Sequence, residues 1–225
     1  MRTFCVFGDS VAKGVVYDAL RQKYIFLKDS CAELFKRSTD SDVKNYSRFG
    51  CTVIKGEEML ARHESEIAGY DSICLEFGGN DCDFKWAEIA AAPDAEHLPN
   101  VPLAEFEERY RAMVGRIRSL GGKPVMLTLP PLLATRFLDW ISRGLDRDNI
   151  LKWLGDVEHI YRWHEMYNDV VCDIARSENV PLINIRRSFL RQNRYGDFLC
   201  EDGMHPNERG HVLISKTLQA YMQNA

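Results

Sequence analysis

Short apolar runs recur along the chain, and each ends at glycine, proline or polar residues. Valine, isoleucine, leucine, phenylalanine and cysteine follow one another in these runs with little alternation with polar residues. Nearly continuous runs of this kind are typical of strands that are buried on both faces of a sheet. The pattern therefore predicts five buried strands, at residues 3–7, 42–46, 72–77, 124–129 and 180–185.

Helical periodicity occupies the stretches between these runs. Apolar residues keep helical spacing over residues 103–120 and again over residues 157–174. Ser30 and Glu33 form a capping-box pattern at the start of an earlier helix, and Asn207 is placed to cap the last one. Strand and helix thus alternate along the chain, which predicts an α/β fold with a roughly five-stranded parallel sheet and helices on both of its faces.

Length and composition favour one domain. The chain has 225 residues, of which 45% are apolar, and it contains no internal repeat, low-complexity tract or linker, so we expect a single domain over residues 1–225. Two segments, 82–102 and 132–154, are long for connections in a compact α/β unit. Both follow the carboxyl ends of predicted strands, where open α/β sheets bind ligands, so they are candidate walls or lids of a pocket.

Charge and cysteine usage narrow the class of protein. A net charge of −4 argues against a phosphate-binding surface, so nucleic acid is not an expected partner. The amino-terminal apolar run is too short for a signal-peptide core, and no stretch reaches membrane-spanning length without charges. Seven cysteines without a C-x-x-C pair indicate reduced thiols. We therefore expect a cytoplasmic protein without stable membrane insertion.

A serine and a histidine stand near opposite ends of the chain, each in a conspicuous setting. Ser10 follows the first apolar run in Gly8-Asp9-Ser10, and His205 lies in Asp202-Gly203-Met204-His205-Pro206, just before the last predicted helix. A serine hydroxyl is a weak nucleophile until a base takes its proton, and imidazole is the usual base near neutral pH. Asp202 can orient that imidazole and stabilise its charged form.

The first three predicted strands lead to Ser10, Gly50 and Asn80. Because the carboxyl ends of parallel strands meet at one edge of a sheet, these residues should lie close together. The backbone N–H groups of Ser10 and Gly50 and the side-chain amide of Asn80 are then candidate donors to the negative charge that develops in acyl transfer. Glycine at position 50 would let a substrate approach the backbone closely.

Four segments occur in one order across nearly the whole chain, namely Gly8-Asp9-Ser10, Gly50, Gly78-Gly79-Asn80-Asp81 and Asp202-Gly203-Met204-His205-Pro206. Together they resemble the motif blocks of the SGNH (GDSL-type) hydrolase superfamily of serine esterases and lipases. The resemblance implies a three-layer α/β/α, flavodoxin-like fold and hydrolysis of esters or thioesters without a metal or organic cofactor. It implies a catalytic triad of Ser10, Asp202 and His205, and an oxyanion hole formed by Ser10, Gly50 and Asn80.

The expected substrate is a small-molecule ester, with a short acyl group on carbohydrate or another polar alcohol. Trp86 and Trp140 fall within the two long connections and are candidates for lining an acyl or sugar pocket. Lysophospholipase, thioesterase and acyltransferase activities would use the same triad and stay open as alternatives. A non-catalytic flavodoxin-like binding module and an enzyme that uses Cys82 or Cys200 are more remote alternatives.

Several neighbouring residues have simpler interpretations. Asp9 and Asp81 are expected to brace the turns that present Ser10 and Asn80. His164 falls within a helical pattern and is expected at the edge of the core or at the surface. A metal site is not expected, because no pair of histidines has the spacing of a zinc-binding helix.

Overall fold

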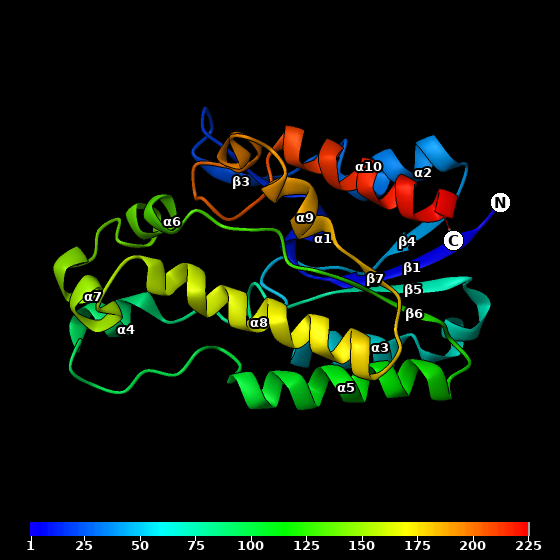
Figure 1. The fold of residues 1–225 in the computed structure, drawn as a ribbon, viewed down its shortest axis with the longest axis horizontal. Helices are drawn as coiled ribbons and strands as arrows, with labels where there is room; N and C mark the ends of the chain where they lie inside the picture. Colours follow the sequence, from blue (N-terminus) through cyan, green and yellow to red (C-terminus); the bar gives the residue numbers. More distant parts are fainter. Residues whose placement is uncertain (225) are drawn as a thin grey trace.

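Five parallel strands form the central sheet of the computed structural model, which describes residues 1–224 (Figure 1). The order across the sheet is β4-β1-β5-β6-β7. The strands are β1 (Thr3–Gly8), β4 (Asp42–Asn45), β5 (Ser72–Glu76), β6 (Pro124–Leu127) and β7 (Leu182–Ile183). Counted along the chain within this sheet, the order is 2-1-3-4-5, as in flavodoxin-like folds. The predicted parallel sheet is confirmed.

Helices cover both faces of the sheet, as the alternation of strand and helix predicts (Figure 1). One face carries α2 (Cys31–Thr39) and α10 (Glu208–Asn224), with α9 (Ile185–Leu190) against α10. The other carries α3 (Val53–Arg62), α5 (Leu103–Ser119) and α8 (Glu158–Ser177). Shorter elements are α1 (Ser10–Lys13) and the 3-10 helices η1 (Glu64–Gly69) and η2 (Tyr195–Phe198). The three-layer α/β/α fold is therefore confirmed.

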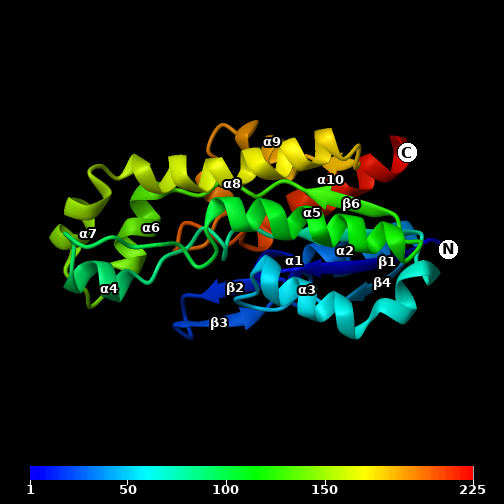
Figure 2. The same cartoon turned by 90° about the horizontal axis from the view of Figure 1, so that it is seen from below.

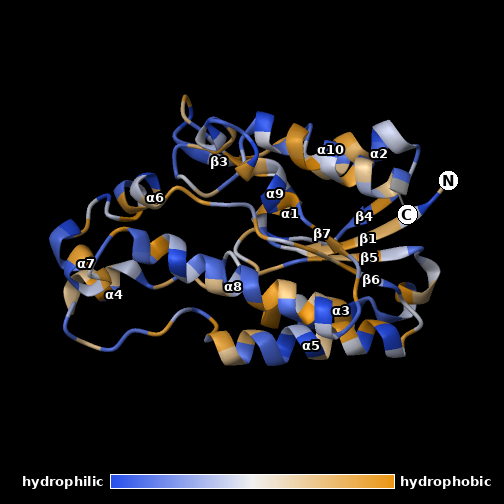
Figure 3. Cartoon of the chain, viewed as in Figure 1, coloured by the Kyte–Doolittle hydropathy of each residue, from blue (hydrophilic) through white to orange (hydrophobic). Residues whose placement is uncertain are grey.

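The main hydrophobic core lies between the sheet and the helices α3, α5 and α8. Cys5 and Phe7 of β1 and Ile73 and Leu75 of β5 are almost fully buried there, together with Tyr110 of α5. Figure 3 shows the same arrangement, with apolar residues concentrated in the central strands and alternating with polar residues along the helices. Each large apolar side chain buried in this way contributes roughly 1.5–3 kcal/mol, so this layer fixes the strands that lead to the sheet edge.

Strand β7 is shorter than the sequence predicts. Of the expected residues 180–185, only Leu182 and Ile183 pair with β6. Pro181 has no N–H to donate, and the side chain of Asn184 accepts a hydrogen bond from the backbone N–H of Arg187 at 2.8 Å. Because Asn184 caps the next helix, the strand ends there.

A two-stranded hairpin outside the sheet is absent from the sequence prediction. It consists of β2 (Val15–Asp18) and β3 (Lys23–Phe26), which pair antiparallel with Tyr17 opposite Tyr24. Figure 2 shows it beside the sheet, next to α1. The Asp18 side chain accepts hydrogen bonds from the backbone N–H groups of Leu20 and Arg21, both at 3.0 Å, and so closes the turn.

The two long connections fold into helices that gather beyond one end of the sheet (Figures 1 and 2). They contain α4 (Trp86–Ala91), α6 (Ala134–Ile141) and α7 (Arg147–Leu154). With the start of α8 they form a separate apolar cluster, in which Phe137 and Leu138 are buried. The apolar segment 132–141 thus packs onto its own molecule. Among residues 1–224, no helix is both long enough and apolar enough to cross a bilayer.

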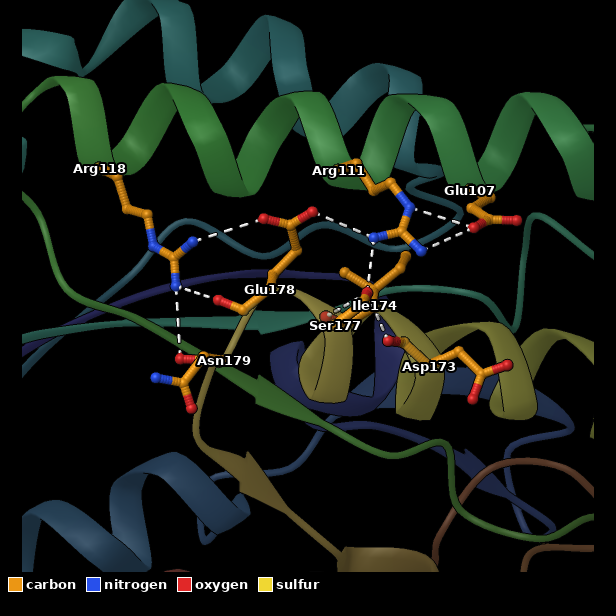
Figure 4. A network of polar contacts seen from close by, with 8 residues as sticks. All are labelled: Glu107, Arg111, Arg118, Asp173, Ile174, Ser177, Glu178 and Asn179. Atoms are coloured by element: carbon orange, nitrogen blue, oxygen red, sulfur yellow. Dashed lines mark hydrogen bonds and ion pairs between the residues drawn. The ribbon is translucent and has the colours of Figure 1, made fainter.

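A polar network fixes the carboxyl-terminal end of α8 against α5 (Figure 4). Arg111 of α5 pairs with Glu107 at 2.8 Å and with Glu178 at 3.1 Å, and it donates to the hydroxyl of Ser177 at 2.8 Å. Arg118 pairs with the same Glu178 at 3.5 Å. A single exposed ion pair contributes little to the free energy of unfolding. Where several charged side chains share a partner, as here, the network favours one arrangement of the two helices. The network therefore holds the helix whose other half borders the candidate site.

Candidate active site

The candidate site lies at the carboxyl edge of the sheet, between β1 and β5. These neighbouring strands flank the point where the strand order reverses, which is where open α/β sheets bind ligands. Ser10 begins α1 directly after β1, and the side chain of Asp9 caps that helix by accepting from the backbone N–H of Val11 at 2.8 Å. Asn80 follows β5. The expected brace at Asp9 is confirmed.

Ser10, His205 and Asp202 form one chain of hydrogen bonds. The Nε2 atom of His205 lies 2.9 Å from the Oγ atom of Ser10, and its Nδ1 atom lies 2.6 Å from Oδ2 of Asp202. All three side chains are buried. Because a carboxylate only accepts, the Nδ1 atom carries a proton and the Nε2 atom of the neutral ring is free to accept the serine proton. The fold thus brings residues from opposite ends of the chain into contact.

Asp202 is held ionised by four donors. Its Oδ1 atom accepts from the backbone N–H groups of Met204 and His205, both at 2.9 Å, and its Oδ2 atom accepts from His205 and from the Tyr24 hydroxyl at 3.0 Å. Burial opposes ionisation, but the hydrogen bonds from His205 and the backbone outweigh it and lower the pKa of Asp202. Burial and the charge of Asp202 raise the pKa of Tyr24, so its hydroxyl stays protonated.

The turn that carries His205 requires glycine at position 203. Gly203 has a φ of 73°, and a Cβ atom there would lie 2.8 Å from the Phe137 nitrogen and 2.9 Å from the Leu133 oxygen. The carbonyl of Gly203 accepts from the N–H of Leu133 at 2.8 Å. This close packing against the start of α6 fixes the position of the histidine turn.

Tyr24 contacts the candidate site, and the sequence analysis did not identify it. It belongs to the hairpin, and its ring centroid lies 5.1 Å from that of His205 and 5.3 Å from that of Phe49. Trp140 packs against the same hairpin, at 4.5 Å from Tyr17 and 6.1 Å from Tyr24. Trp140 therefore lies against the hairpin and is not among the described residues that line the pocket around Ser10.

Asn80 is oriented by Asp9. The Nδ2 atom of Asn80 donates to Oδ2 of Asp9 at 3.0 Å. Since a carboxylate only accepts, this contact decides which end of the amide faces Asp9. The backbone carbonyl of Asn80 accepts from the side chain of Asn100 at 2.9 Å. One N–H of the Asn80 amide is thus engaged, and the other stays available to a bound group.

Buried carboxyl groups lie behind Asn80. Burial raises the pKa of Asp9, and burial together with the charge of Asp9 raises the pKa of Glu76 well above its usual range. Glu76 is therefore the group of this pair that holds a proton, and its Oε2 atom accepts from the backbone N–H of Ala12 at 3.3 Å. Burial also raises the pKa of Asp81 to about 7, and its Oδ1 atom accepts from the backbone N–H of Val53 at 2.8 Å. The expected brace at Asp81 is confirmed.

Gly50 lies in the loop between β4 and α3. Its φ of 68° falls in the left-handed region, and nothing lies within 4 Å of an added Cβ atom. Its carbonyl accepts from the Nζ atom of Lys55 at 3.1 Å. Gly50 is not among the described residues that line the pocket around Ser10. Of the three expected oxyanion donors, Ser10 and Asn80 therefore share one pocket wall and Gly50 does not.

Two adjoining pockets extend from Ser10. The first has room for about 20 Å³ and is lined by Ser10, Asn80 and His205 among others. The second also has room for about 20 Å³ and shares Gly79, His164 and Met204 with the first. Its apolar walls come from the two long connections and α8, namely Phe84, Trp86, Leu132, Phe137, Leu154, Ile160 and Trp163. Trp86 thus lines the second pocket, as the sequence suggests, and both long connections supply walls.

Thiol chemistry is disfavoured at this site. All seven cysteines are free, and burial raises the pKa of Cys82 well above its usual value and that of Cys200 to about 12. The reactive form of cysteine is the thiolate, so neither residue is a nucleophile near neutral pH. Within residues 1–224, no three histidine, cysteine or acidic side chains are grouped as a metal site requires.

The comparisons with known proteins agree with this geometry. The model of the GDSL-like lipase/acylhydrolase family matches residues 6–213, which include Ser10, Asn80 and His205. The chain therefore belongs to this family of SGNH hydrolases, and it is a carboxylic ester hydrolase. A search of curated proteins gave no match.

Solved structures share the fold over the whole chain. A lipase/acylhydrolase from Enterococcus faecalis is 20% identical, with coverage of 100% of this chain and 96% of that chain and a TM-score of 0.71. A lipolytic protein of the G-D-S-L family from Veillonella parvula is 16% identical, with 100% of both chains covered and a TM-score of 0.65. The psychrotrophic esterase EstA from Pseudoalteromonas sp. is 15% identical, with coverage of 100% and 98% and a TM-score of 0.60.

Proposed function

We propose that this esterase works through an acyl-enzyme formed on Ser10. The observation that carries the proposal is the hydrogen-bonded chain from Ser10 Oγ to His205 Nε2, at 2.9 Å, and from His205 Nδ1 to Asp202, at 2.6 Å. His205 takes the serine proton as Oγ attacks the ester carbonyl, and then gives it to the oxygen of the leaving alcohol. The same nitrogen next activates a water molecule that releases the acid. Asp202 positions the imidazole and balances its charge.

The developing oxyanion is stabilised by the N–H of Ser10, the N–H of Gly50 and the side-chain amide of Asn80. The support for Asn80 is its fixed orientation, because Asp9 engages one N–H and leaves the other for substrate. Ser10 begins a helix, so its N–H has no partner within that helix. The left-handed backbone of Gly50 and the open space around it are compatible with close approach of a substrate.

The proposed substrate is a short acyl group on carbohydrate or another polar alcohol. Two pockets with room for about 20 Å³ each are far smaller than typical ligand sites, which favours a small acyl group near Trp86. The alcohol faces the hairpin side, where Trp140 lies. Lysophospholipid or thioester hydrolysis and acyl transfer to a second alcohol are the alternatives on the same triad, and a series of acetyl to long-chain esters, with lysolipids and acetylated sugars, distinguishes them.

We further propose that residues 1–225 act as a single domain, with segments 82–102 and 132–154 as the pocket walls. The apolar cluster that these segments form with α8 supports this assignment. A cytoplasmic location is proposed as well. The seven free cysteines support a reducing compartment, since secreted proteins usually pair theirs.

The proposal is tested with Ser10→Ala and a p-nitrophenyl ester. We expect turnover to fall by about four orders of magnitude or more, because the nucleophile is lost, while circular dichroism and thermal unfolding stay close to those of the wild type. Undiminished turnover would contradict the assignment and favour a non-catalytic role for this cleft.

A further inference from the structure

His164 lies on α8 at the junction of the two pockets. Its side chain is 3% exposed, and it lines both the pocket around Ser10 and the aromatic pocket behind it. The sequence pattern places it among ordinary helical positions, yet the fold turns it toward the site. It is therefore a polar side chain in the path of any group that extends from Ser10 into the second pocket.

The imidazole of His164 has no hydrogen-bond partner inside the protein. Its Nδ1 atom is buried without one, and its Nε2 atom makes no hydrogen bond to a described residue. Asn168, one turn further along α8, differs: it donates to Glu165 at 3.1 Å and accepts from the backbone N–H of Leu129 at 3.2 Å. Buried polar groups are normally paired, so an unpaired one that borders a pocket points to a partner that enters the pocket.

The ring is neutral. Burial and the positive charge of Arg186 lower the pKa of His164 to about 3. A neutral imidazole has one N–H donor and one acceptor nitrogen, and it therefore pairs with neutral polar atoms such as an ether or hydroxyl oxygen. The nearby charge of Arg186 disfavours a cationic substituent at this place.

The remaining polar groups of the second pocket are already engaged. The Nε1 atom of Trp86 donates to Asp83 at 2.8 Å, and that of Trp163 donates to the carbonyl of Cys82 at 3.0 Å. His159 is half-buried and can pair with solvent. Among the buried polar side chains of this lining, His164 is thus the one whose hydrogen bonds are left for a ligand.

We propose that His164 hydrogen-bonds to a polar atom of the acyl group, so that the pocket selects short hydroxyacyl or alkoxyacyl groups over plain alkanoyl groups. This specificity rests on the proposed function of Ser10, because the acyl group is placed by its bond to that residue. A site built to pair with an oxygen atom discriminates against an analogue that lacks it, since the site's own polar group is then left unpaired.

The test compares two p-nitrophenyl esters of equal chain length, the butyrate and the methoxyacetate, in which an ether oxygen replaces one methylene group. The ratio of their kcat/KM values is measured in wild type and His164→Leu, because the intrinsic reactivity of each ester cancels between the two proteins. We expect His164→Leu to lower the preference for the methoxyacetate by about 3- to 10-fold, as loss of one hydrogen bond predicts.

Matched variants separate this role from a structural one. His159→Leu places the same substitution on the same helix and pocket wall, and it should leave the ratio unchanged because His159 is partly exposed. His164→Gln keeps a donor and an acceptor and should retain the preference. His164→Leu should unfold at the same temperature as wild type or higher, since an apolar group replaces an unpaired buried polar one. His164→Phe is a second apolar variant with the same expected ratio.

An unchanged ratio in both His164→Leu and His164→Phe would overturn the inference and indicate that an internal water molecule pairs with the imidazole. If Ser10→Ala is inactive in that case, the proposed triad stands and only the role of His164 fails. If the wild type hydrolyses neither ester, the proposed function and this inference both fail.

Discussion

Two buried acidic groups flank Ser10, and their pKa values are shifted in opposite directions. Asp202, reached through His205, accepts four hydrogen bonds, and its pKa is lowered in spite of burial. Asp9, adjacent to Ser10 in sequence, accepts from Val11 and Asn80 and lies against the carboxyl of Glu76, and burial raises its pKa. Both carboxyl groups are buried, yet their pKa values shift in opposite directions, because the number of donors around each carboxyl group decides its ionisation.

The difference suits two tasks. In the proposed mechanism, an ionised Asp202 balances the positive charge that His205 gains when it takes a proton. The pKa values of Asp9, Glu76 and Asp81 are all raised, so the group holds protons more readily and adds less negative charge close to the place where an oxyanion would form. Its task is to orient Asn80 and to brace the loops at the sheet edge.

After Ser10→Ala, the largest expected effect comes from Asp202→Asn. An amide at this position accepts less strongly and favours the wrong imidazole tautomer, so kcat should fall by about three to four orders of magnitude. Steady-state kinetics with a p-nitrophenyl ester measures this loss, and the melting temperature reports whether the turn is intact. A loss of less than tenfold would show that Asp202 is not the group that positions His205.

Asn80→Ala should have the next largest effect. Removal of one oxyanion donor costs about 100- to 1,000-fold in kcat, with a smaller change in KM. Asn100→Ala is the matched control, because Asn100 holds only the carbonyl of Asn80 and its loss should cost far less. Equal losses in the two variants would mean that Asn80 acts through the loop rather than through its side-chain amide.

Tyr24→Phe should lower kcat by only about 2- to 10-fold, since three other donors to Asp202 remain. Loss of the hydroxyl leaves Asp202 with fewer donors, which raises the pKa of its carboxyl toward the usual value, so the acid limb of the kcat/KM profile should move to higher pH. Tyr17→Phe, opposite Tyr24 in the hairpin, serves as the control. Identical pH profiles in wild type and Tyr24→Phe would contradict a role through Asp202.

Asp81→Asn should change stability with pH more than it changes activity. Burial raises the pKa of Asp81 to about 7, so its contribution to stability is complete below its unfolded value near 3.8 and is lost as the pH rises through about 7. The free energy of unfolding of the wild type, measured in urea, should therefore fall from pH 5 to pH 8 by roughly 2–3 kcal/mol relative to the variant. Parallel pH profiles for the two proteins would contradict the raised pKa.

The motif residues could be found from the sequence because each follows a strand directly. Once the runs ending at Gly8 and Phe77 are identified as parallel strands, Ser10 and Asn80 must share an edge. The hairpin could not be found in this way, because its turn at residues 19–22 lacks the Asn-Gly or Asp-Gly pair typical of tight hairpins and places Gln22 at a φ of 50°.

Contacts between distant segments explain the other omissions. The bond from Tyr24 to Asp202 joins residues 178 positions apart, and no local pattern indicates it. His164 keeps the spacing of a core helix, and periodicity does not distinguish a residue that packs in the core from one that borders a pocket. Trp86 and Trp140 occupy similar connections in the sequence, yet only Trp86 lines a pocket that adjoins Ser10.

The most direct test of the account is the mass of the protein after reaction with a fluorophosphonate, followed by peptide mapping. We predict a single adduct on Ser10, formed in step with the loss of esterase activity, and no adduct in Ser10→Ala. An adduct at another residue, or full activity in a protein whose Ser10 is completely modified, would contradict the central role of Ser10.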